Sequence, residues 1–157
     1  MCTIGAKILS PGGEFVLFKN RDFTRARFED TFVSDAGYFG VMGVETWDND
    51  GSAADHLSGF SIGFNAHLAC CDSNVRSIPD GENYDKLVQA VVEECTSIDE
   101  AEALLRDLVR ANRYHWANVL VATADEVAAF EVHHQQIEVQ RNEVSLVRAN
   151  HHVCLGP

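Results

Sequence analysis

Apolar and polar positions alternate in short runs through the first half and the last third of the chain, and follow a helical period only between them. The first runs, Thr3–Leu9 and Glu14–Phe18, flank Ser10-Pro11-Gly12-Gly13, which is typical of a β-hairpin with a tight turn. Further strands are predicted at residues 38–46, 59–64 and 67–71, and residues 24–35 are predicted as an irregular loop.

Two amphipathic helices are predicted in the middle of the chain. In residues 84–95 the apolar positions are Leu87, Val88, Val91 and Val92, which share one helical face. Ser97, with Glu100 three residues later, is a capping box that predicts a second helix over residues 98–113. Strands resume at residues 116–122, 127–132, 137–140 and 143–148. Strands, two helices and more strands predict an α+β fold whose helices cover one face of a sheet.

Composition narrows the functional classes. A chain of 157 residues with 46% hydrophobic content fits a single domain, 1–157, with a substantial core. Twelve Lys and Arg against 24 Asp and Glu give a net charge of −12, which repels phosphate backbones and anionic lipids and argues against nucleic-acid partners. There is no bilayer-spanning apolar run and no signal-peptide pattern, so we expect no membrane partner and a cytoplasmic protein.

The cysteines and histidines give no pattern of a disulfide framework or a metal site. Five cysteines, an odd number without a signal peptide, argue against structural disulfides. Cys70 and Cys71 are adjacent, so alternation is expected to place one of them in the core. No Cys-x-x-Cys or His-x-x-x-His spacing occurs, and His133-His134 and His151-His152 are interpreted as structural strand residues pointing to opposite faces. Neither a metal nor a cofactor is predicted.

The N-terminus carries the candidate chemistry. If Met1 is removed, Cys2 has a thiol with a reference pKa of about 8.5 and an α-amine with one of about 7.7–8.0, so nucleophile and general base share one residue. Cys2 lies about nine residues before the turn centre and Asp22 about ten after it, so the return strand can bring Lys19, Arg21 and Asp22 to the terminus. The cations would favour thiolate and Asp22 would orient the ammonium. The alternative is a buried strand cysteine beside a solvated strand end.

Four segments, in order along nearly the whole chain, carry a family resemblance. They are Met1-Cys2-Thr3, Lys19-Asn20-Arg21-Asp22, residues 63–69 and Arg148-Ala149-Asn150-His151. Together they resemble the N-terminal-nucleophile (Ntn) cysteine amidohydrolases, in the group of choloylglycine hydrolases, penicillin V acylases and related acyltransferases. The resemblance implies a four-layer αββα sandwich. Because the pattern supplies one helical layer, the chain would be a compact or incomplete version of it.

The resemblance also implies roles for single residues. Cys2 matches the nucleophile, Asp22 the carboxylate that holds its amine, Asn74 an oxyanion-hole residue, and Asn150 the later Asn that contacts the amine or the oxyanion. Lys19 stands where the family usually has Arg, so a flexible ammonium replaces a planar guanidinium at this position. Arg21, in a normally apolar position, is the candidate to compensate for it. The family continues beyond its Asn-His segment and supplies another Arg from that region. A compact chain, an incomplete one or a completing partner chain would each account for this difference.

The expected function is hydrolysis or acyl transfer at a small linear amide through a thioester of Cys2. One alternative is a non-catalytic or partner-completed binding domain with the same fold, related to a group whose motif is Asn-Arg-Asp-Glu. Another is a redox-sensitive thiol protein that uses Cys70 or Cys71. The expected partner is a small-molecule amide, with a homo-oligomer or a second chain to complete the site. The sequence leaves open the acyl and amine groups of the substrate.

Overall fold

The structure, a computed structural model, describes residues 2–20, 31–35, 37–42, 59–73, 82, 84–112 and 114–155. The first two strands, β1 (Thr3–Ile8) and β2 (Phe15–Asn20), form the predicted hairpin, with Thr3 opposite Asn20 and Ile8 opposite Phe15. On the other edge of β1 lies β10 (Ser145–Arg148), so the two ends of the chain share one three-stranded antiparallel sheet.

The second sheet has seven antiparallel strands in the order β3-β4-β5-β6-β7-β8-β9. Most of them fall where the alternating pattern predicts them, within a few residues at the ends. Residues 32–35 differ from the prediction: instead of an irregular loop they form β3, paired to β4. The strands are β3 (Phe32–Asp35), β4 (Tyr38–Met42), β5 (Phe60–Asn65), β6 (Ala69–Asp72), β7 (Tyr114–Ala122), β8 (Val127–His134) and β9 (Gln136–Asn142).

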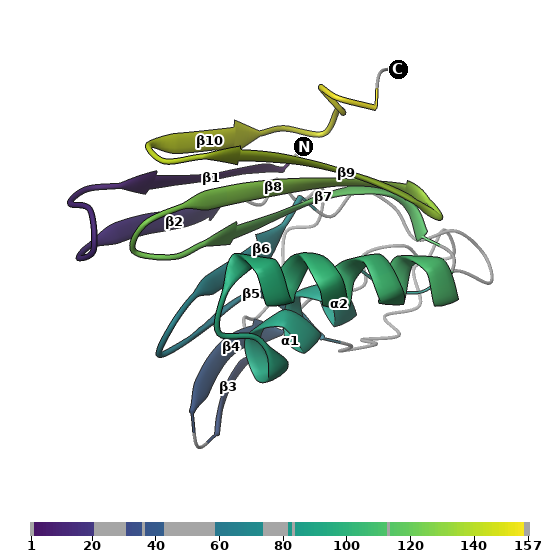
Figure 1. Cartoon of the computed structure of the whole chain (residues 1–157). Coiled ribbons are helices and arrows are strands. Elements are labelled where there is room, and N and C mark those ends of the chain that lie inside the picture. Colours follow the sequence, from purple (N-terminus) through teal and green to yellow (C-terminus); the bar gives the residue numbers. More distant parts are fainter. Residues whose placement is uncertain are drawn as a thin grey trace.

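The elements form three layers (Figure 1). Helices α1 (Asp85–Glu94) and α2 (Ile98–Ala111) pack on one face of the seven-stranded sheet, around a core that includes Phe60, Leu87 and Phe130. The three-stranded sheet packs on the opposite face, around Ile4, Leu120 and other apolar residues. The fold is therefore α+β, as predicted. Within the described residues, helices cover only one side of this pair of sheets.

The predicted capping box begins α2, with one difference in its bonding. Ser97 Oγ accepts a hydrogen bond from the Glu100 N–H at 3.2 Å. The Glu100 carboxylate accepts from the Thr96 N–H at 2.7 Å and from the Thr96 hydroxyl, which lowers the pKa of Glu100. The reciprocal bond thus reaches one residue further back than in the usual box. Neither helix of the described part of the chain is long and apolar enough to cross a bilayer.

The Cys70-Cys71 pair corrects one prediction. Both side chains are fully buried, because helices cover one face of β6 and the three-stranded sheet covers the other. Cys70 joins the helix-side core and Cys71 the core between the sheets. Burial raises the pKa of both thiols well above the ordinary range, so both remain protonated near neutral pH.

The first histidine doublet also departs from strand alternation. His134 has a φ of 55° at the tight turn between β8 and β9, and the rings of His133 and His134 lie only 4.5 Å apart instead of on opposite faces. Within the described residues, no group of three or more His, Cys, Asp and Glu side chains could hold a metal ion.

Candidate functional site

Strand pairing brings Cys2 and Asn150 together across the whole chain. Ile4 lies opposite Arg148 in the antiparallel pair of β1 and β10, so two residues further on the register leads Cys2 to Asn150. The Cys2 main-chain nitrogen donates a hydrogen bond to Asn150 Oδ1 at 3.1 Å. Cys2 is partly buried and is a free thiol. A side-chain oxygen is therefore held at the atom that becomes the α-amine when Met1 is removed.

Asn118 holds the turn that carries Asn150. This residue lies in β7 and is fully buried. Its Nδ2 donates to the carbonyl oxygens of Ala149 at 2.6 Å and His151 at 3.2 Å, the two residues that flank Asn150. An amide with two donors suits this place because both flanking groups are acceptors. The backbone on either side of Asn150 is therefore bonded to the seven-stranded sheet.

Glu131 and Arg148 fix the chain on both sides of that turn. The Glu131 carboxylate, on β8, accepts hydrogen bonds from the N–H groups of Val153, Cys154 and Leu155 at 2.8, 2.7 and 3.0 Å. It also accepts from Arg148 Nε at 3.1 Å, and the two side chains are 1% and 5% exposed. Burial alone would raise the pKa of Glu131, but the three N–H donors and the Arg148 charge outweigh burial and lower it.

We call Asn118, Glu131 and Arg148 the terminal anchor. Arg148 also donates to Gln140 and to the Val147 carbonyl, so its guanidinium is bonded on several sides. Sequence reasoning did not single out Asn118 or Glu131. The available signal was a polar residue in an otherwise apolar strand, because such a residue is buried only when it has a partner.

Lys19 lies on β2 opposite Ile4, and its ammonium is buried. Its Nζ donates to Asp72 Oδ1 at 2.9 Å and to the Ser61 carbonyl at 3.1 Å, with side-chain exposures of 3% for Lys19 and 0% for Asp72. Desolvation alone would lower the pKa of Lys19, but the charges of Asp72 and Asp85 reverse this and raise it. Lys19 therefore remains a cation whose described partner is Asp72, a residue that the sequence analysis did not single out.

The remaining predicted site residues, Arg21, Asp22 and Asn74, lie outside the described residues. Their roles stay predictions from the family resemblance. Of the predicted set, the structure brings Cys2 and Asn150 into contact and places Lys19 on the neighbouring strand.

The other thiols are less suited to nucleophilic chemistry than Cys2. Burial raises the pKa of Cys95 to about 11, and Cys70 and Cys71 are more strongly affected. Cys154 is exposed, and its N–H is bound to Glu131. A reactive thiol needs both access and a neighbouring base or positive charge, and only Cys2 would have a base of its own, the α-amine formed by loss of Met1.

Comparison of the chain with protein-family models and with curated proteins gave no match.

Proposed function

We propose that Cys2, after removal of Met1, is the nucleophile of an amidohydrolase or acyltransferase that acts on a small linear amide. The observation that carries this proposal is the 3.1 Å hydrogen bond from the Cys2 nitrogen to Asn150 Oδ1. In the processed chain that nitrogen is an amine with a reference pKa near 7.7–8.0, so it can accept a proton from its own thiol near neutral pH.

The reaction proceeds in two balanced steps. Cys2 Sγ attacks the carbonyl carbon of the amide while the thiol proton passes to the α-amine. The tetrahedral intermediate collapses, the C–N bond breaks, and the leaving amine takes the proton from the α-ammonium, which leaves a thioester on Cys2. Water or an acceptor amine then attacks the thioester, the α-amine takes its proton and returns it to sulfur, and the acid or the new amide departs.

In this mechanism Asn150 Oδ1 orients the amine, and the terminal anchor keeps Asn150 in place. Asp22 as the second partner of the ammonium, and Asn74 as an oxyanion donor, are assigned from the family resemblance. We further propose that the helical layer and the two sheets correspond to three layers of the αββα sandwich, which the order of layers in Figure 1 supports.

The direct test is turnover of a panel of N-acyl amines and N-acyl amino acids by wild type, Cys2→Ser, Cys2→Ala and Cys154→Ala. Loss of the nucleophile should reduce turnover by about a thousandfold or more, as with other nucleophile deletions. Cys154→Ala, which removes an exposed thiol, should leave it unchanged. Equal melting temperatures would show that the variants are folded. Full turnover by Cys2→Ala would reject the mechanism.

A partner-completed binding domain is the second candidate function. The observation that favours it is the difference between the sheets: three strands cover seven, and a partly exposed apolar face remains on β3, β4 and β5. Acylation of Cys2 distinguishes the two candidate functions, because a binding domain would give no acylated Cys2 with any member of the panel.

A further inference from the structure

The two sheets stack strand over strand, and the smaller sheet ends early. Strand β10 lies against β8 and β9, β1 against β7 and β8, and β2 against β6. The next strand of the larger sheet beyond β6 is β5, followed by β4 and β3. Within the described residues, no strand of the smaller sheet lies over these three.

The uncovered face is apolar. Phe39 lies opposite Phe64, and Val41 lies opposite Ile62, which packs into the core between the sheets. The rings of Phe39 and Phe64 are 5.4 Å apart, and Phe64 is 52% exposed. This surface therefore continues the inter-sheet core outward past β2.

A cavity of about 500 Å³ lies between this face and β2. Its walls include Phe15 and Leu17 from β2 and Phe39, Ile62 and Phe64 from β4 and β5, and the turn after β5 closes one end. Leu17 and Phe15 also pack against the inter-sheet core, so the cavity is the continuation of that core.

β2 is an edge strand among the described residues, since it pairs only with β1. An edge strand has an unpaired row of main-chain donors and acceptors, which can bind another extended chain. A strand added there would lie about 4.8 Å from β2, over β5, in a sheet about 10 Å above it. Every second side chain of that strand would then point into the cavity.

The occupant cannot be a second copy joined edge to edge with its layers in the same order. Since β2 lies over β6 in every copy, the second β2 would bring its own β6 beneath it. That position is already filled by β5. A segment without an underlying sheet of its own meets no such obstacle.

Charge specifies the occupant further. The chain has a net charge of −12, and the exposed residues Glu14 and Asp125 are the sequence neighbours of Gly13 and Ala124, which line the cavity. Glu126, next to Asp125, is paired with Arg141 at 3.3 Å, so Glu14 and Asp125 carry the exposed negative charge here. The acidic surroundings favour a segment with Lys or Arg at the end nearest the β1–β2 and β7–β8 turns, which carry Glu14 and Asp125.

We infer that the β2 edge and the apolar face of β4 and β5 bind an extended segment of a partner protein, apolar at alternate positions and basic at its end. This inference does not depend on the chemistry of Cys2. It rests on the strand stacking, the open edge and the cavity.

The probe is a fluorescent peptide of about eight residues, the length of an ordinary strand, in which valine alternates with threonine between terminal lysines. Binding is measured by fluorescence anisotropy, and amide hydrogen exchange of β2 by NMR. We expect binding with slower exchange at Phe15 and Leu17. The Leu9 N–H donates to the Glu14 carbonyl, so by alternation Val16 and Phe18 bond to β1, and the N–H groups of Phe15 and Leu17 face the open edge. A peptide of the same composition with its valines grouped together should bind at least about tenfold more weakly, because it can fill the cavity only partly.

The matched protein variants are Phe64→Ser, Phe39→Ser and Val144→Ser. The first two remove cavity walls and should weaken binding by about tenfold or more, whereas Val144 is 60% exposed and does not line the cavity, so Val144→Ser should not change it. Equal binding of both peptides, or no protection of β2 at the highest soluble peptide concentration, would overturn the inference. So would a homodimer abolished by Phe64→Ser, or a cavity that takes detergent or fatty acid and not the peptide.

Discussion

Glu131 is a buried carboxylate that satisfies three consecutive backbone N–H groups and an arginine. It stabilises the fold through its bonds to these N–H groups and by pairing with Arg148, whose guanidinium would otherwise be buried without a counter-charge. The same reasoning applies to Lys19 and Asp72, where each charge is tolerated in the interior because the other is present.

Glu131→Gln should lower the free energy of unfolding by about 3 kcal/mol, because an amide presents donors to Arg148 and to N–H groups that need acceptors. The folded-state pKa of Glu131 is lowered from 4.5. The ionised group therefore adds stability above about pH 4.5, and this stability is lost as pH falls through the lower folded pKa. Urea unfolding across this pH range should show the difference between wild type and variant shrinking in acid. A constant difference would contradict this role.

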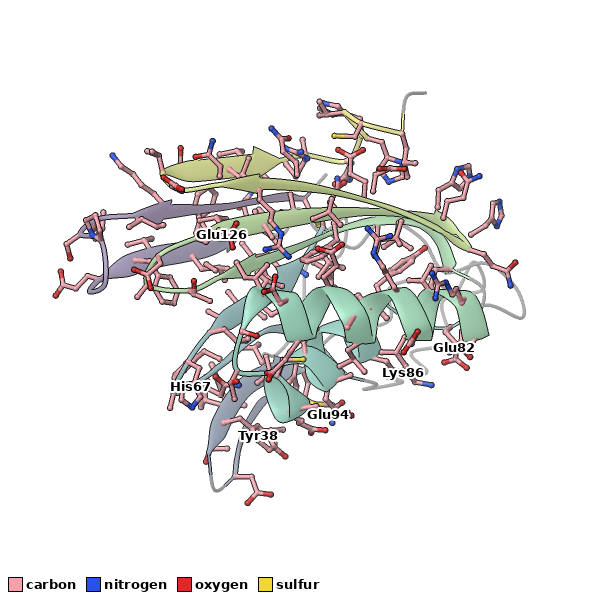
Figure 2. The ribbon with its side chains drawn as sticks, viewed as in Figure 1. Tyr38, His67, Glu82, Lys86, Glu94 and Glu126 are labelled. Carbon is pink, nitrogen blue, oxygen red and sulfur yellow. The ribbon has the colours of Figure 1, made fainter. Side chains whose placement is uncertain are left out.

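Lys19→Met should destabilise the protein by about 3–5 kcal/mol, because it leaves the Asp72 carboxylate buried without its cation. Lys86 is the matched control. Its ammonium pairs with Glu82 at 2.7 Å, beside it at the surface, with exposures of 53% and 40% (Figure 2). Lys86→Met should therefore cost about 0–1 kcal/mol. Chemical unfolding measures both, and equal costs would show that the Lys19 pair is not a buried one in solution.

At the scale of elements, β7 links the interior of the large sheet to the site. Asn118 of this strand donates hydrogen bonds to the carbonyl oxygens of both residues that flank Asn150. β10 supplies the other constraint through its register with β1. A strand and a hairpin that are far apart in sequence thus determine where one amide oxygen lies.

Asn118→Ala should free the turn at Ala149 and His151 while leaving the β1–β10 register intact. We expect faster amide exchange at residues 149–155 and a fall in turnover of about tenfold or more, because the amine of Cys2 loses its fixed acceptor. Asn112→Ala, at the C-terminal end of α2 where its Nδ2 bonds Leu108, is a control of the same chemical change. Faster exchange without loss of turnover would show that catalysis does not require the terminal anchor.

The local patterns predicted most elements, because hairpin turns, the capping box and helical periodicity are encoded within a few residues. The sequence analysis missed β3 because Phe32–Asp35 follows a charged stretch. This segment is a strand because it pairs with β4, and its own composition does not predict that pairing. Cys70 and Cys71 were misjudged because one-sided burial was assumed, whereas layers lie on both faces of β6. Asp72 and Glu131 acquire their roles from strands distant in sequence.

In the molecule as a whole, the described helical layer and the two unequal sheets bring Cys2 and Asn150 together and leave apolar surface on the smaller sheet. Val16, Phe18 and Val147, on its outer face, are 46%, 45% and 56% exposed. The contact of Cys2 with Asn150 follows from this architecture, because β1 and β10 are neighbours in the same sheet. Cys2 and Asn150 were singled out from the sequence, but their meeting required the register.

In the proposed mechanism, the processed terminus attacks an amide carbonyl. Intact-mass measurement of the purified protein, before and after exposure to an acylating amide or its thiol-reactive analogue, tests it most directly. We expect a chain lighter by Met1 that gains a single acyl group, located on Cys2 by fragmentation. Retention of Met1 in protein that turns over substrate, or an acyl group on another cysteine with Cys2 unmodified, would contradict it.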